Sequence, residues 1–257
     1  MSGSRDALSD TWVLAKRAFL RIIRAPDLIL AFTVQPIMFV LLFAYVFGGA
    51  IETPGYDYID FLIPGILVQT MSFGGFVTAL GLAEDLKKGL VDRFRSLPMS
   101  RSAVLAGRTL ADVATNTISI TVMLVVGVII GFSFHAPFLH IVAGILLLLL
   151  FGYAFSWVFA FIGLTSSSPE AAQSLGFIII FPLTFISSAF VPPDSMPAAL
   201  QAFAEVNPFT ITVDAMRSLF LGAPAGNDVW GAVAWSIGIA AFFAFLAVAK
   251  YKRAVVR

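Results

Sequence analysis

Few side chains in this sequence could carry out covalent or metal chemistry. The chain of 257 residues has no cysteine, so neither a disulfide nor a thiolate metal site can form. Its two histidines, His135 and His140, fall at the predicted outer ends of apolar segments, where they are expected to be interfacial residues. No phosphate-binding G-x-x-x-x-G-K-S/T loop and no HExxH pair of metal ligands occur. We therefore expect no catalytic residue, no metal site and no cofactor bound by this chain.

A basic segment between the second and third apolar runs could bind a partner protein. Residues 84–107 read EDLKKGLVDRFRSLPMSRSAVLAG, and apolar residues recur there about once per helical turn. A short amphipathic helix of this kind can dock into a groove of a cytoplasmic partner. The alternative is a basic tether that only sets topology, but a tether does not need apolar residues at helical spacing. The candidate docking residues are Glu84, Asp85, Leu86, Leu90, Arg93, Phe94, Arg95, Leu97, Pro98 and Arg101.

Phenylalanine is abundant, with 26 residues, and in three apolar segments it recurs every three or four positions. Residues at this spacing lie on one face of a helix. Each of these segments also contains a proline (Pro36, Pro64 or Pro182), which kinks a helix. We predict that the aromatic faces line a path for an apolar molecule, with rings that face lipid as the alternative. Two glutamines near these prolines are also candidates for the path, and their alternative role is to hydrogen-bond one helix to another. The candidate path residues are Gln35, Phe39, Phe43, Gln69, Phe73, Phe76, Phe177, Phe181 and Phe185.

Charged side chains are almost absent from the apolar segments. Asp112 follows Arg108 by four residues near the start of the third segment, so an ion pair within one helical turn is expected. Asp214 and Arg217, three residues apart, are expected to form an ordinary surface ion pair. Ionisable residues inside membrane segments mark ion or proton paths. Their scarcity here argues against a proton- or sodium-coupled transporter and against a charged channel filter.

The composition indicates a membrane protein. Hydrophobic residues make up 59% of the chain and charged residues 12%, against about 25% charged residues in soluble domains. A helix that crosses a bilayer needs about 20 mostly apolar residues, and continuous apolar runs favour helices over barrel strands. We predict an all-α polytopic membrane protein with a single transmembrane domain over residues 1–257. Its six transmembrane helices are Leu28–Ala50, Phe61–Ala83, Thr109–Gly131, Leu139–Gly163, Ala171–Val191 and Val229–Ala249.

The distribution of Lys and Arg predicts the orientation of these spans. Fifteen of the sixteen lie before the first span, in residues 84–108 or in the C-terminal tail. The positive-inside rule therefore places both termini and residues 84–108 in the cytoplasm. Residues 1–27 do not resemble a signal peptide, because they lack a separate short apolar core. Within them, Thr11–Arg24 predicts an amphipathic helix in the headgroup plane, with a cytoplasmic helix that only orients the first span as the alternative.

The segment 192–228, predicted to lie outside, is too long for an ordinary connection. Asn207 before Pro208 has the pattern of an N-cap with proline at the first helical position, and Gly222 fits the position after a helix end. These signals predict a helix Pro208–Leu221, whose 14 residues are too few to span a bilayer. A second short helix is predicted over Met196–Val206. We expect the two to form a re-entrant pair in the outer leaflet.

Two motifs resemble the permeases of ABC-2-type exporters, in particular the daunorubicin/doxorubicin-resistance branch. The first runs from Glu84 to Arg108, with EDLKKG, RFRSLPMSR and VLAGR, and the second runs from Asn207 to Arg217, with NPF and DAMR. The resemblance covers essentially the whole chain. It implies a six-span permease that dimerises, with itself or with a related permease, and binds two copies of a cytoplasmic ATP-binding-cassette ATPase that holds ATP and Mg²⁺. It also implies that Glu84–Leu97 is the coupling helix and Met196–Leu221 the outer re-entrant pair.

The expected function is that of a permease subunit in the plasma (inner) membrane that moves a hydrophobic or amphipathic drug or lipid outward. The chain would not be an enzyme, because a separate ATPase would power it. A net charge of +1 gives no reason to expect a nucleic acid partner. Two alternatives are a permease for lipid-linked glycans or polysaccharides and a non-transporting membrane anchor for a cytoplasmic protein. Phe-rich spans without cations favour a hydrophobic cargo, and an anchor would not require three kinked spans.

Overall fold

The computed structural model describes residues 26–47, 51, 53, 55, 57–87, 101–223 and 226–254, and all regular structure in these residues is helical. The elements are α2 (Pro26–Leu42), the π-helical turn η1 (Phe43–Phe47), α3 (Tyr58–Phe73), α4 (Phe76–Lys87), α6 (Arg101–Ile129), α7 (Phe138–Thr165), α8 (Pro169–Phe185), the 3₁₀ turn η2 (Pro193–Ser195), α9 (Ala198–Val206), α10 (Pro208–Leu221) and α11 (Asp228–Ala254). The predicted all-helical class is thus confirmed for the described part of the chain.

Among the described residues, four helical stretches are long and apolar enough to cross a membrane. They are Tyr58–Lys87, Leu105–Ile129, Phe138–Thr165 and Asp228–Tyr251, and each overlaps a predicted span. The other two predicted spans correspond to shorter apolar helices, Val34–Val46 and Pro169–Phe185. These segments agree with a polytopic membrane protein, and the number of six spans stays a prediction.

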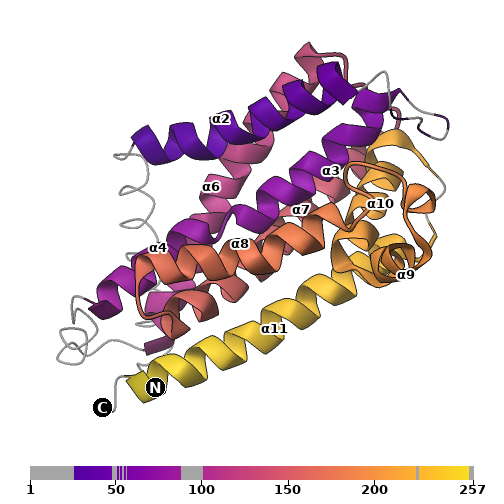
Figure 1. Cartoon of the computed structure of the whole chain (residues 1–257). Coiled ribbons are helices and arrows are strands. Elements are labelled where there is room, and N and C mark those ends of the chain that lie inside the picture. Colours follow the sequence, from indigo (N-terminus) through magenta and orange to yellow (C-terminus); the bar gives the residue numbers. More distant parts are fainter. Residues whose placement is uncertain are drawn as a thin grey trace.

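The helix α7 occupies the centre of the bundle. It packs against α3, α4, α6, α8, α10 and α11, while α2 and α11 lie on opposite sides (Figure 1). Phe151 and Phe159 of α7 are fully buried, as are Leu62 of α3 and Phe209 and Phe220 of α10. A second buried cluster, at the C-terminal part of α7, includes Trp157, Leu82 of α4, Leu105 of α6 and Tyr251 of α11. Close van der Waals packing of several helices around one central helix therefore holds the bundle together.

The predicted second span, Phe61–Ala83, is interrupted. Helix α3 ends at Phe73, and α4 begins at Phe76 after a tight turn at Gly74 and Gly75. Both glycines allow close packing at this point. A Cβ atom on Gly74 would lie 2.0 Å from Oδ1 of Asn116, and one on Gly75 would lie 2.7 Å from the Cα atom of Ser156. The break thus brings the chain directly against α6 and α7.

The predicted fifth span, Ala171–Val191, is wrong at its C-terminal end, because α8 stops at Phe185. Asn207 caps this end: its Nδ2 donates to the carbonyl oxygens of Leu183 and Ile186, each at 2.7 Å. These bonds satisfy two carbonyls that a helix end leaves without an intrahelical partner. The chain after Phe185 therefore turns away from the helix axis.

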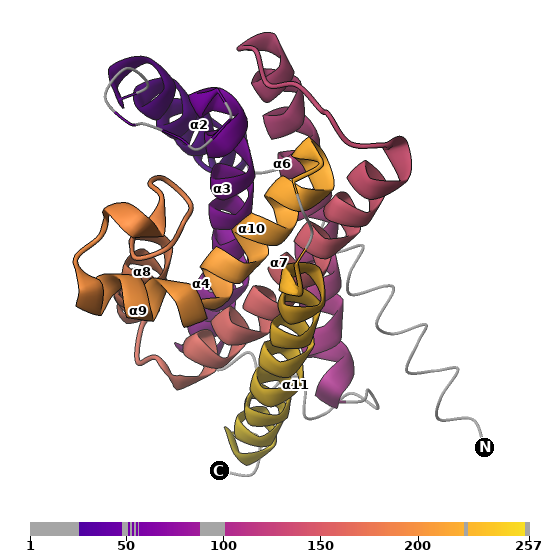
Figure 2. The ribbon, with the colours of Figure 1, turned by 90° about the vertical axis from the view of Figure 1, so that its right-hand side faces the viewer.

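Helices α9 and α10 lie at the end of the bundle where α3 begins and α8 ends, and Figure 2 shows α10 crossing that end. We call this end the outer end, after its predicted orientation. The predicted helix Pro208–Leu221 is confirmed, with the Asn207 side chain accepting from the Phe209 N–H and with Gly222 in the left-handed conformation at φ 72°. The second predicted helix begins at Ala198 instead of Met196. The following Pro197 explains this shift, because a residue before proline favours extended backbone, and Met196 has ψ 151°.

Two predictions lie outside the described residues. They are the amphipathic helix Thr11–Arg24 and the part of the docking segment between Lys87 and Arg101.

Candidate functional site

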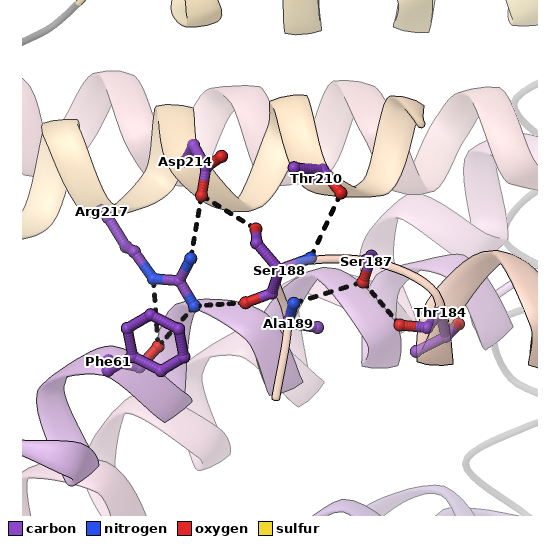
Figure 3. Close-up of polar contacts among 8 residues, drawn as sticks. All are labelled: Phe61, Thr184, Ser187, Ser188, Ala189, Thr210, Asp214 and Arg217. Atoms are coloured by element: carbon purple, nitrogen blue, oxygen red, sulfur yellow. Dashed lines mark hydrogen bonds and ion pairs between the residues drawn. The ribbon is translucent and has the colours of Figure 1, made fainter. Parts of the chain in front are cut away.

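A buried arginine joins three separate parts of the outer end (Figure 3). Nε and Nη2 of Arg217, on α10, both donate to the carbonyl oxygen of Phe61 on α3, at 3.2 and 3.0 Å. Nη2 also donates to the carbonyl oxygen of Ser188, which follows α8, at 2.6 Å. Nη1 donates to Oδ1 of Asp214 at 2.8 Å, and the guanidinium carbon lies 3.5 Å from the centre of the Phe61 ring. One side chain therefore connects α10, α3 and the segment after α8.

The expectation of an ordinary surface ion pair is wrong for this arginine. The pair with Asp214 forms, but the Arg217 side chain is only 8% exposed, against 39% for Asp214. The sequence gives no sign of this burial, because the acceptors lie 156 and 29 residues away. Burial lowers the pKa of Arg217 to about 10, while the nearby Asp214 carboxylate raises it. The guanidinium thus stays charged at neutral pH.

Local features of the chain make room for this network. Pro64 of α3 has no N–H to donate to the carbonyl oxygen of Asp60, four residues earlier, and this disturbs the helix next to Phe61. Gly65 lets the backbone after α8 approach α3, since a Cβ atom there would lie 2.1 Å from the Ala189 oxygen. Oγ of Ser188 donates to Asp214, and the Ser188 N–H donates to Thr210. The outer end is therefore held by polar contacts in addition to apolar packing.

The predicted aromatic faces meet within one chain. Phe39 stacks on Phe43 at a centroid distance of 6.0 Å, and Phe43 stacks on Phe190 at 4.5 Å. Phe190 contacts Phe185 at 5.1 Å, and Phe185 contacts Phe181 at 4.8 Å. We call the resulting series of rings the phenylalanine row. Its members in order are Phe39, Phe43, Phe190, Phe185, Phe181, Phe177, Phe73, Phe76 and Phe159.

All seven phenylalanines predicted for the path belong to this row, and the sequence reasoning missed two members. Phe190 joins the α2 rings to the α8 rings, but it lies after the end of α8 and outside the four-residue spacing of that helix. Phe159 is fully buried on α7 and contacts Phe76 at 5.4 Å. Of the predicted glutamines, Gln35 is exposed, whereas Gln69 is buried at 7% exposure. The two glutamines therefore lie in different environments, whereas the seven predicted rings belong to one series of contacts.

The predicted ion pair between Arg108 and Asp112 does not form. Arg108 instead pairs with Asp85 on α4, and Oδ1 of Asp112 accepts from the Thr78 hydroxyl at 3.0 Å. Asp112 is only 1% exposed, although the sequence placed it near the cytoplasmic surface. The partner on α4 prevails over the partner one turn away because α4 and α6 lie side by side here.

Three of the predicted docking residues lie on the last turns of α4, at the end that continues toward the basic segment. Leu86 is half-buried and packs against the second buried cluster, which includes Trp157, and Glu84 is also half-buried. Asp85 is held by Arg108. Arg101 is the first residue of α6, and the remaining candidates lie outside the described residues: Leu90, Arg93, Phe94, Arg95, Leu97 and Pro98.

Comparison with known proteins identifies the family. Residues 9–221 match the model of the ABC-2 type transporter family. The daunorubicin resistance ABC transporter permease protein DrrB1 of Streptomyces coeruleorubidus is 34% identical over 246 residues, 96% of this chain and 87% of that protein. The probable doxorubicin resistance ABC transporter permease protein DrrC of Mycobacterium tuberculosis is 24% identical over 259 residues, covering 99% and 94%. The probable multidrug ABC transporter permease YbhR of Escherichia coli is 26% identical over 210 residues, covering 79% and 55%. The family match and the first of these similarities show that the chain belongs to the ABC-2 type transporter family.

Proposed function

We propose that this chain is the membrane-spanning permease subunit of an exporter that moves a flat, hydrophobic drug outward. The phenylalanine row carries the proposal. Aromatic rings present apolar, polarisable faces on which another planar molecule can stack. The names of two relatives refer to resistance to daunorubicin or doxorubicin, which agrees with a cargo of this kind.

The exposure of the rings changes along the phenylalanine row. Phe181 and Phe185 are 42% and 37% exposed, whereas Phe76 and Phe159 are buried. The exposed rings lie on α8 beside Pro182, and Phe43 lies in the π-helical turn after α2. We propose that a second permease chain, identical or related, faces these rings, so that the path lies between the two. Such a cargo would move along apolar surface rather than through a polar channel.

ATP hydrolysis is assigned to a separate ATP-binding-cassette protein, with two copies per pair of permeases. The ATPase would hold ATP and Mg²⁺ and would contact the segment from Glu84 to Arg101. The segment begins on the last turn of α4 and ends at the first residue of α6, and both helices continue into the bundle. We further propose that both termini and this segment face the cytoplasm, as the distribution of Lys and Arg indicates.

The proposed path is tested by replacing one exposed ring in the row with an aliphatic residue of similar apolarity. We expect Phe181→Leu to change the relative export of daunorubicin and of drugs without a planar ring system, because leucine has no ring to stack on. The measurement is a resistance profile in cells that also produce the ATP-binding protein which copurifies with this chain. Phe245→Leu is the matched control, since Phe245 is 73% exposed on α11 and is not a member of the row.

An unchanged profile for Phe181→Leu, at normal expression and with the ATPase bound, would show that this ring only faces lipid. A wild-type complex that confers no resistance to any planar drug would refute the proposed cargo itself. Equal changes in both variants would show a general effect of losing a phenylalanine, which also contradicts the proposal.

A further inference from the structure

The contact between α4 and α6 contains a line of polar residues. Arg108, Asp112 and Asn116 are spaced by four residues along one face of α6. Arg108 pairs with Asp85, Asp112 accepts from Thr78, and Asn116 lies against Gly74, just before α4. The numbers of these three partners fall as those on α6 rise, as expected for antiparallel neighbours.

Asp112 is incompletely paired in this line. Its Oδ1 accepts from Thr78, but Oδ2 has no hydrogen-bond partner among the residues that the structure describes. The side chains that face the carboxylate from α4 and α7, Thr78 and Ser156, are both neutral. Burial of a carboxylate is costly unless a partner compensates it. Arg108 is the cation nearest along α6, one turn away and therefore within reach of Asp112.

The guanidinium of Arg108 lies beside Gly81 of α4. Its Nη1 atom is 2.7 Å from where a Cβ atom of Gly81 would be, so the guanidinium lies directly over this glycine. Gly81 is four residues from Asp85 and three residues from Thr78, the partner of Asp112. The absence of a side chain at Gly81 leaves room for the guanidinium to move from one carboxylate to the other.

We propose that Arg108 exchanges its partner during transport, from Asp85 to Asp112. The proposal rests on the proposed function, since it requires an ATPase that moves the end of α4. Asp85 belongs to α4 and moves away from Arg108 when the two helices separate. Asp112 belongs to α6 and keeps its distance from Arg108 whatever α4 does. Asp112 is thus a positioning residue that receives the cation when the pair with Asp85 opens.

The test combines Asp112→Asn and Arg108→Gln, singly and together, in the complex with its ATPase. Asp112→Asn keeps the shape of the side chain and an acceptor for Thr78, and it removes only the charge. We expect at least a tenfold slower ATP-driven export of daunorubicin in each single variant. The double variant should be no slower than the slower single variant, because both changes remove the same pair. In the nucleotide-free complex, thermal unfolding should show stronger coupling of Arg108 with Asp85 than with Asp112.

A matched control and a second variant make the result specific. Asp60→Asn makes the same chemical change at another buried carboxylate, which accepts from the Ser133 N–H at 3.0 Å on the outer side, and it should export normally. Gly81→Val retains all three charged residues but places a side chain in the space beside Arg108. It should slow export severalfold, and it can be measured even if Asp112→Asn does not fold.

Several results would overturn the exchange. They are wild-type export by Asp112→Asn, export losses that multiply in the double variant, and wild-type export by Gly81→Val. Each of them leaves the proposed function in place, provided that the wild-type complex exports the drug. Failure of the wild-type complex to bind an ATPase or to export the drug would instead refute the proposed function.

Discussion

Replacing Arg217 with glutamine should destabilise the fold more than any other single change to the outer end. The variant loses hydrogen bonds to the oxygens of Phe61, Ser188 and Asp214, and it loses the ring contact. A hydrogen bond from a charged donor contributes roughly 1.5–3 kcal/mol, and breaking a buried ion pair costs about 3–5 kcal/mol. Because water reaches the partly exposed Asp214, the free energy of unfolding should fall by about 3–5 kcal/mol rather than by the sum of all bonds.

This loss corresponds to a melting temperature lower by roughly 6–20 °C, since 1 kcal/mol shifts a chain of this size by about 2–4 °C. The assay is thermal unfolding of the purified protein in detergent, followed by loss of the monodisperse species. Asp214→Asn is the comparison variant. It keeps an oxygen that accepts from Arg217 but removes the counter-charge of the buried guanidinium, so it should cost about 1–3 kcal/mol. Arg217→Lys should lie between the two, because an ammonium group cannot reach all three acceptors at once.

The stability supplied by Arg217 should not change with pH near neutrality. Burial lowers its pKa to about 10, so the folded chain releases this proton at a lower pH than the unfolded chain. The difference affects stability only as the pH rises through about 10, where it favours the folded state. The melting difference between wild type and Arg217→Gln should therefore be constant between about pH 6 and pH 9. A melting temperature of Arg217→Gln within about 2 °C of wild type would refute this account of the network.

Two further predictions concern the outer capping residue and the topology. Asn207→Ala removes the cap of α10 and both bonds to the end of α8, so we expect a loss of about 2–4 kcal/mol in unfolding experiments. Asn207→Ser, which keeps an acceptor for the helix N-terminus and loses the donors, should lose part of this stability, and equal stability of all three proteins would contradict the double role. For the topology, Asp57→Cys and Asp228→Cys should react with an impermeant thiol reagent in intact cells, whereas Gly89→Cys should not. The chain has no native cysteine, so labelling at residue 89 from outside would reverse the proposed orientation.

The sequence by itself determines the features that depend on neighbouring residues. The apolar runs predict where the membrane-crossing helices lie, because the length of a run must match the thickness of the bilayer. The boundaries of α10 are also predictable, since Asn207, Pro208 and Gly222 act within one turn of the helix ends. The helical spacing of the phenylalanines likewise predicts which rings share a face on each helix.

Only the tertiary structure decides which of several chemically similar partners a side chain meets. Arg108 has a carboxylate one turn away on its own helix, and it pairs instead with Asp85 on α4. Arg217 is buried because Phe61 and Ser188, distant in the sequence, supply the acceptors that compensate for its lost hydration. Phe190 completes the phenylalanine row only because α8 ends early and the chain turns back toward α2. Local sequence fixes the helices, but the choice among long-range partners depends on how the helices pack, and no short stretch of sequence contains that information.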